Sequence, residues 1–442
     1  MKISLSDHFT YQKLLRFTLP SIIMMIFTSI YGVVDGFFVS NLVGKTPFAA
    51  LNFIMPFIMV LGAFGFMFGT GGSAIVAKIM GEGDKKQAND VFSMLVYVSF
   101  VCGIVIAVPG VVFMEKVSAL LGAEGEMLRY CTLYGRIVIA ALPAFMLQME
   151  FQSFFITAEK PQLGLFVTVA AGVTNMVLDA LFIAVFKWGL AGAAAATALS
   201  QVVGGIVPLV YFFMPNSSLL RLGKYRSNRK ALLKTCTNGS SELMSNVSMS
   251  LVGMLYNIQL IAYAGENGVA AYGVLMYVNF VFLSAFIGYS IGTAPVISYH
   301  YGAENHTELK SLLKKSLVII GVFSLSMVCL SLLLARPLSV MFVGYDAQLL
   351  ELTVRGFYFF SFSFLFAGFA IFGSSFFTAL NNGLVSALIS FLRTLAFQAG
   401  AIMIFPLIWG TDGIWISVSA AELMACVITF GFILAMRKKY KY

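Results

Sequence analysis

The run FSMLVYVSFVCGIVIAVPGVVFM, residues 92–114, is apolar almost throughout and contains no charged side chain. A helix of about 20 such residues crosses a hydrocarbon core roughly 30 Å thick. No water reaches that core, so each backbone N–H and C=O must find its partner within the segment, as an α-helix allows. The run therefore predicts a membrane-spanning helix.

Similar runs recur along the whole chain. Of its 442 residues, 60% are hydrophobic and 11% charged, with a mean hydropathy of +0.91, whereas soluble domains have about 25% charged residues. Continuous apolar runs exclude a transmembrane β-barrel, whose strands alternate. We predict an all-α integral membrane protein with twelve transmembrane helices, near residues 14–40, 50–79, 92–114, 131–157, 163–186, 190–213, 235–264, 271–300, 316–335, 352–379, 384–408 and 412–436.

The distribution of basic residues predicts the topology. The formal net charge is +9, and with the N-terminus inside, 20 of the 28 Lys and Arg residues fall in cytoplasmic segments and 7 in external ones. This bias follows the positive-inside rule. We expect a multi-pass protein of a cytoplasmic (inner) membrane, with both termini in the cytoplasm. Topology accounts for the basic charge, so no nucleic-acid partner is expected.

The chain also matches itself when shifted by 221 residues. The shift aligns GKTPFAA (44–50) with GENGVAA (265–271), and Trp188-Gly189 with Trp409-Gly410. Six spans per half is an even number, so the halves share one orientation and are related by a pseudo-two-fold axis along the membrane normal. We expect two six-helix bundles, residues 1–213 and 235–442, joined by a basic cytoplasmic linker, 214–234.

Carboxylates within the predicted spans are candidate functional groups, because an ionisable group deep in a membrane is costly. Asp35 lies nine residues before the first external turn, and Asp179 nine residues before the third. Asn175 is one helical turn from Asp179 on the same face. Thr197 returns to the same depth in the following span. These four side chains are therefore expected to converge in the N-terminal half.

Two acids, an amide and a hydroxyl suit a hard cation such as Na⁺, or a proton on a desolvated carboxylate. Their counterparts in the second half, at the 221-residue shift, are Tyr256, Ala396, Gly400 and Val418. The cluster is thus unique to the first half. The alternative is that each polar group makes an ordinary helix-packing contact; the common depth of the four favours an ion site.

Several motifs together resemble the multidrug and toxic compound extrusion (MATE) family, in its prokaryotic branch with the cation site in the N-terminal lobe (DinF-like or MepA-like). The resemblance covers essentially the whole chain. It implies the MATE fold with a V-shaped central cavity, a monomer, and export of organic cations in exchange for H⁺ or Na⁺. The motifs are VVDGFFVSNLVG (33–44), FGTGGSAIVAKIMGEGD (68–84), FQSFFITAEKP (151–161), TNMVLD (174–179) and GAAAATALSQ (192–201).

The same resemblance assigns cation binding to Asp35, Asn175, Asp179 and Thr197, and adds the backbone of Ala193 as a further ligand. For the substrate, aromatic faces attract cations and Met side chains adapt their shape. The candidate substrate-binding residues are Glu150, Glu242, Phe154, Met276, Tyr277 and Tyr289.

For Glu150 and Glu242, the alternative is a polar contact near the cytoplasmic mouth of the protein. A second pair of intramembrane charges, Arg393 and Glu422, lies in the last predicted hairpin. We expect these two residues to form a structural ion pair.

Other function classes find little support in the sequence. It contains no GxxxxGK[ST] motif for ATP, and its three histidines and five scattered cysteines show no hydrolase or metal-site spacing. We therefore expect no enzyme, no cofactor and no metal beyond Na⁺ at the cation site. The predicted function is a cation-coupled (H⁺ or Na⁺) antiporter that exports lipophilic organic cations by alternating access. The alternative is a lipid-linked precursor flippase, but only Arg393 lies well inside a span to hold phosphates.

Overall fold

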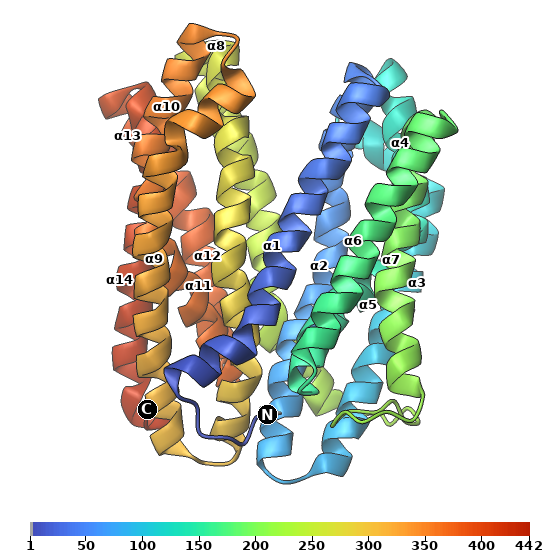
Figure 1. Ribbon diagram of the computed structural model, residues 1–442, viewed down its shortest axis with the longest axis vertical. Helices are drawn as coiled ribbons and strands as arrows, with labels where there is room; N and C mark the ends of the chain where they lie inside the picture. Colours follow the sequence, from blue (N-terminus) through green and yellow to red (C-terminus); the bar gives the residue numbers. More distant parts are fainter. Residues whose placement is uncertain (1–2) are drawn as a thin grey trace.

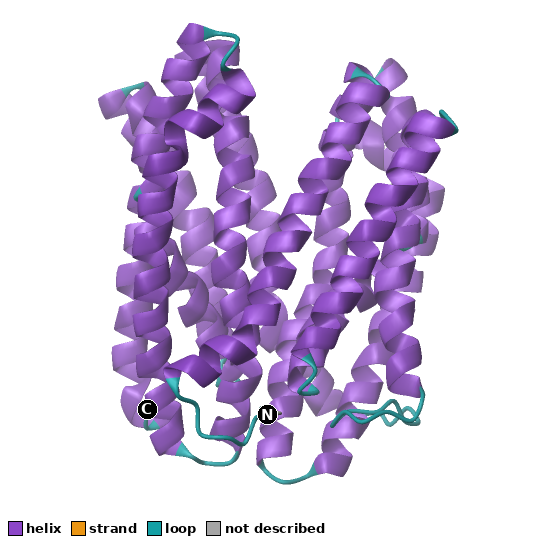
Figure 2. Ribbon diagram, in the orientation of Figure 1, coloured by secondary structure: helices purple, strands orange, loops and turns teal. Residues whose placement is uncertain are grey.

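The computed structural model describes residues 3–442, and within that range the chain is helical with short connections and no strand (Figure 2). The first half contains seven α-helices and one π-helical turn, η1. Their bounds are α1 Tyr11–Leu42, α2 Lys45–Gly81, α3 Lys85–Leu120, α4 Gly125–Ala140, α5 Leu142–Thr157, α6 Pro161–Asp179, η1 Ala180–Val185 and α7 Gly189–Phe213.

The second half also contains seven α-helices and one π-helical turn, η2. Its bounds are α8 Arg229–Gly302, α9 His306–Val343, α10 Ala347–Ser361, α11 Phe364–Ala379, α12 Gly383–Phe391, η2 Leu392–Ala396, α13 Phe397–Trp409 and α14 Thr411–Tyr440. The long helix α8 consists of two arms that meet at Gly265, where φ is 62° and ψ is −154°. Glycine adopts such a backbone conformation readily because it has no Cβ.

The twelve predicted spans are confirmed when bent helices are counted as single spans. Ten helices of the described residues are long and apolar enough to cross a membrane, with the two arms of α8 counted separately. Two further spans are helix pairs, α4 with α5 and α10 with α11, bent by 58° and 50°. Pro143 follows the first bend and lacks the N–H that would continue the helix. The second bend has no proline, and hydropathy predicts neither.

The internal duplication is visible in the backbone. The two bends fall at Ala141 and Phe362, which are 221 positions apart. Gly189 and Gly410, separated by the same shift, both have positive φ, 58° and 57°. The halves thus share local conformation as well as sequence.

The two groups of helices form the arms of a V (Figure 1). Helices α1–α7 make up one arm, the N-lobe, and α8–α14 make up the other, the C-lobe. Both chain termini lie at the end of the molecule toward which the arms converge. We call this the terminal end of the molecule and the opposite end the distal end.

The lobes touch through a reciprocal contact of α2 with the second arm of α8. A Cβ placed on Gly81 would lie 2.1 Å from the Tyr299 carbonyl oxygen, and one on Gly302 would lie 2.1 Å from the Lys78 carbonyl oxygen. Each residue is 221 positions from its counterpart, so the same patch faces itself, as a two-fold axis requires. Small residues allow helix backbones to approach this closely in membranes.

The lobes are also joined by side chains. Near the middle of α1, Ser29 shares a hydrogen bond with Ser284 of α8. One cluster of buried apolar residues includes members from both lobes, whereas the second belongs to the C-lobe alone. The shared packing holds the base of the V together.

Candidate cation-binding site in the N-lobe

Asp35 on α1 and Asp179 at the end of α6 lie side by side inside the N-lobe. Their side chains are within hydrogen-bonding reach of each other, and the residues are 7% and 0% exposed. After Asp179 the chain leaves the α-helix for the π-helical turn η1. Such turns recur at functional sites because they interrupt the regular backbone hydrogen bonds.

This pair of acids has no basic partner. Within the described residues, no Lys or Arg forms an ion pair with either carboxyl group, and Asp35 Oδ1 and both Asp179 carboxyl oxygens lack a hydrogen-bond donor. Two ionised carboxylates can only accept hydrogen bonds, and burying them unpaired is costly. Their contact is therefore favourable only when a proton or a cation lies between them.

The amide and hydroxyl predicted from the sequence supply further free oxygens. Asn175, one turn before Asp179 on α6, is 1% exposed, and its Oδ1 atom has no partner. The hydroxyl oxygen of Thr197, on α7, is also buried without a partner. Ala193 is fully buried one turn before Thr197. These orphan oxygens are the kind of group that a bound cation would satisfy.

Tyr134 on α4 belongs to the same cluster, and the sequence reasoning missed it. Its side chain is fully buried, its hydroxyl adjoins Thr197, and Asp35 and Asp179 are close enough to interact with it electrostatically. The hydroxyl also donates to Met55 Sδ at 3.9 Å. One of 18 tyrosines in an apolar chain carries no distinguishing spacing, so only the packing of α4 reveals it.

The six candidate substrate-binding residues do not form one cluster. Glu150 is fully buried in α5 beside Ser99, with no partner for either carboxyl oxygen. The Phe154 ring packs edge-on against Phe92 at 4.8 Å, and the Tyr289 hydroxyl donates to Ser316 Oγ at 2.9 Å. Because Phe154 and Tyr289 are fully buried, neither can contact a substrate in this conformation.

The other three lie on α8 and are more accessible. Met276 and Glu242 are half-buried, and Tyr277 is 41% exposed. Glu242 lies within electrostatic range of Arg393. Arg393 Nε donates to Glu422 Oε2 at 2.8 Å, so the predicted ion pair is confirmed.

Comparison with solved structures gives the fold class: the all-helical fold of solved MATE transporters. A MATE transporter crystallised in complex with MaL6 matches with a TM-score of 0.93 at 23% identity, covering 98% of both chains. An outward-facing multidrug resistance MATE family transporter matches with a TM-score of 0.90 at 23% identity, covering 98% of this chain and 97% of that one. These matches establish the fold.

Sequence comparison then gives the family. The MatE family model matches residues 20–181 and 243–400, and the chain belongs to the MATE family. The multidrug export protein MepA of Staphylococcus haemolyticus is 28% identical over 332 residues, 75% of this chain and 72% of that protein. MepA of Staphylococcus aureus strain NCTC 8325 is 26% identical over 324 residues, 73% of this chain and 70% of that protein. The resemblance stated from the motifs is thus confirmed.

Proposed function

We propose that this chain is a cation-coupled antiporter that exports lipophilic organic cations in exchange for H⁺ or Na⁺. One observation carries the proposal: Asp35 and Asp179 meet inside the N-lobe without a basic partner. Such a pair binds a proton or a metal cation in one state of the protein and releases it in another. Asn175, Thr197 and the backbone of Ala193 complete the proposed site, which requires no cofactor and a single copy of the chain.

We assign the terminal end to the cytoplasm. Basic residues lie there at the start of α3 and α8 and at the end of α14: Lys85, Lys86, Arg229, Lys230, Arg437, Lys438 and Lys439. The positive-inside rule supports this orientation. The distal end then faces outward, and the V in Figure 1 is the outward-facing state of an alternating-access cycle. A cation can drive that cycle only through different affinities for the two states.

For the substrate, the multidrug export relatives support a drug-like molecule, and the accessible carboxylate of Glu242 favours a cationic one. We assign contact with it to Glu242, Met276 and Tyr277, the accessible candidates on α8. A half-buried carboxylate attracts a cation without fully burying its own charge. Glu150, Phe154 and Tyr289 require a change in helix packing before they contact the substrate.

Efflux of ethidium from vesicles containing the purified protein tests the proposal. The vesicles receive a pH gradient or a Na⁺ gradient, and Asp35→Asn and Asp179→Asn are compared with wild type. Asp412→Asn, which removes a carboxylate paired with Arg355 outside the N-lobe, is the matched control. We expect one gradient to drive efflux, both site variants to lose it, and the control to retain it. Efflux that survives both site substitutions in folded protein would contradict the assigned coupling site.

A further inference from the structure

The segment before α1, residues 3–10, is fixed to both lobes at the terminal end. On the N-lobe side it meets Glu159, in the turn between α5 and α6. Ser4 Oγ donates to Glu159 Oε1 at 2.5 Å, and the Leu5 backbone N–H donates to the same oxygen at 2.8 Å. A carboxylate that accepts a backbone N–H makes a charge-assisted hydrogen bond.

On the C-lobe side the segment meets a second carboxylate, Glu308 in the first turn of α9. His8 Nδ1 lies 2.6 Å from Glu308 Oε2, and the Phe9 backbone N–H donates to Glu308 Oε1 at 2.9 Å. Lys315, two turns further along α9, donates to the Phe9 carbonyl oxygen. Four residues after the first anchor, the chain is therefore held by the opposite lobe.

Burial shows that residues 3–10 form a packed interface with the two lobes. Leu5 and Phe9 have no exposed surface, and Glu159 and Glu308 are only 7% and 5% exposed. The Phe9 ring packs edge-on against His300 of α8, with ring centroids 6.5 Å apart. Withdrawing the segment would expose two apolar side chains and leave a desolvated carboxylate short of donors, which costs free energy.

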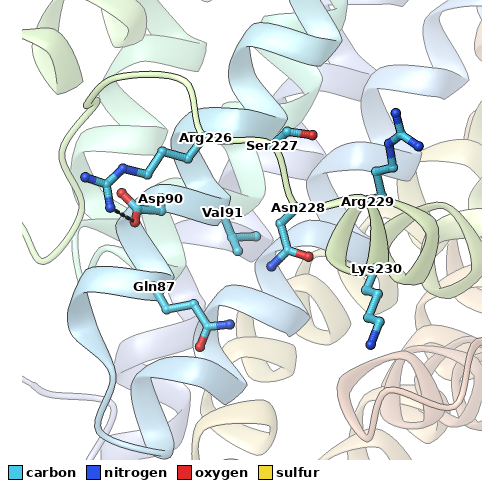
Figure 3. A pocket seen from close by; sticks show the side chains of 8 residues that line it. All are labelled: Gln87, Asp90, Val91, Arg226, Ser227, Asn228, Arg229 and Lys230. Carbon is cyan, nitrogen blue, oxygen red and sulfur yellow. Dashed lines mark hydrogen bonds and ion pairs between the residues drawn. The ribbon is translucent and has the colours of Figure 1, made fainter.

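The internal duplication provides a second segment of the same kind (Figure 3). Residues 225–230 are the counterparts of 4–9 at the 221-residue shift, and they lie beside α3, the counterpart of α9. Just before them, the Gly223 N–H donates to Ser93 Oγ at 2.8 Å. Within them, Arg226 pairs with Asp90 at 3.1 Å. A pocket of about 360 Å³ remains between this segment and α3. In both halves, the segment that precedes the first helix of one lobe thus lies on the third membrane span of the other lobe.

We propose that residues 3–10 form a latch that holds the two lobes together at the terminal end and must release Glu308 before that end can open. The segment continues directly into α1, and Glu159 also belongs to the N-lobe, so this anchor travels with the segment. Glu308, Lys315 and His300 belong to the C-lobe and separate from it when the lobes part. The inference rests on the proposed alternating access, because only a protein that opens at the terminal end needs a release.

Disulfide cross-linking tests the latch directly in the full chain, with the five native cysteines replaced by alanine. One variant carries His8→Cys with Glu308→Cys, across the lobes; its matched control carries Ser4→Cys with Glu159→Cys, within the N-lobe. We expect oxidation to abolish ethidium efflux in the first variant, reduction to restore it, and the control to keep efflux in both conditions. Full efflux with the His8–Glu308 link formed would overturn the latch. Loss of efflux in the oxidised control would overturn Glu159 as the lasting anchor.

A second measurement does not depend on transport. Spin labels on Lys86→Cys and Lys310→Cys, exposed positions at the starts of α3 and α9, report the separation of the lobes at the terminal end. We expect Glu308→Gln to increase the population with a long distance and Glu304→Gln, which removes an exposed charge on the same side, to leave it unchanged. Identical distance distributions in the two variants would overturn the latch. Absence of ethidium efflux from protein in which residues 3–10 and Glu308 are unchanged would count against the proposed function alone.

Discussion

Tyr134 supplies the one hydroxyl at the cation site that comes from α4. We expect Tyr134→Phe to weaken the affinity for the coupling ion about fivefold, because a net hydrogen bond contributes roughly 1 kcal/mol. The dependence of efflux on Na⁺ or H⁺ concentration gives this affinity. Tyr358→Phe, at an exposed tyrosine, should leave the dependence unchanged. Equal dependence in both variants would remove Tyr134 from the site.

The Arg393–Glu422 ion pair is expected to stabilise the fold, and this contribution can be tested. Its side chains are 14% and 4% exposed, so removing one partner leaves a buried, unpaired charge. We expect Arg393→Gln alone to destabilise the protein by about 3–5 kcal/mol. The double change Arg393→Gln with Glu422→Gln should cost less, because no charge remains unpaired. Thermal unfolding of wild type, both single variants and the double variant in detergent measures this, and additive losses would show that the two residues do not interact.

Among the helices, the crossing of α2 with α8 sets how closely the lobes approach. A side chain at Gly81 would meet the Tyr299 carbonyl oxygen, so we expect Gly81→Val to separate the lobes there and lower the unfolding temperature. Gly431→Val is the control, since nothing lies within 4 Å of a Cβ at that position in α14. Equal unfolding temperatures in the two variants would show that the crossing tolerates a wider spacing.

Helix positions were predictable because hydropathy and lipid thickness leave little freedom to a spanning segment. The bends were not, since hydropathy averages over the residues that interrupt a helix. Depth matching brought Asp35 and Asp179 together correctly because both are counted from a turn at the same membrane surface. It could not find Tyr134, whose position depends on how α4 packs against α7. Nor could it show that Phe154 and Tyr289 are buried, because rotation of a helix about its axis is set by its neighbours.

For the molecule as a whole, alternating access predicts opposite changes at its two ends. Glu124, in the N-lobe, and Tyr345, in the C-lobe, are exposed near the distal end. We expect spin labels at these positions to come closer when the acid pair is emptied of its cation and substrate is added. Labels at positions 86 and 310 should move apart under the same conditions. Distances that change in the same direction at both ends would exclude rocking of the two lobes about their shared base.

The two segments that lie on α3 and α9 bear on how such a chain arose. If each half descends from one six-helix protein that worked as a pair, the segment preceding its first helix would have reached the neighbouring copy. Fusion of the two copies would then have turned a contact between subunits into a contact within one chain. A gene split within the linker should therefore still give an assembled transporter when both pieces are made together. The first piece alone should be recovered poorly, because Phe9 would have no partner surface on α8 and α9.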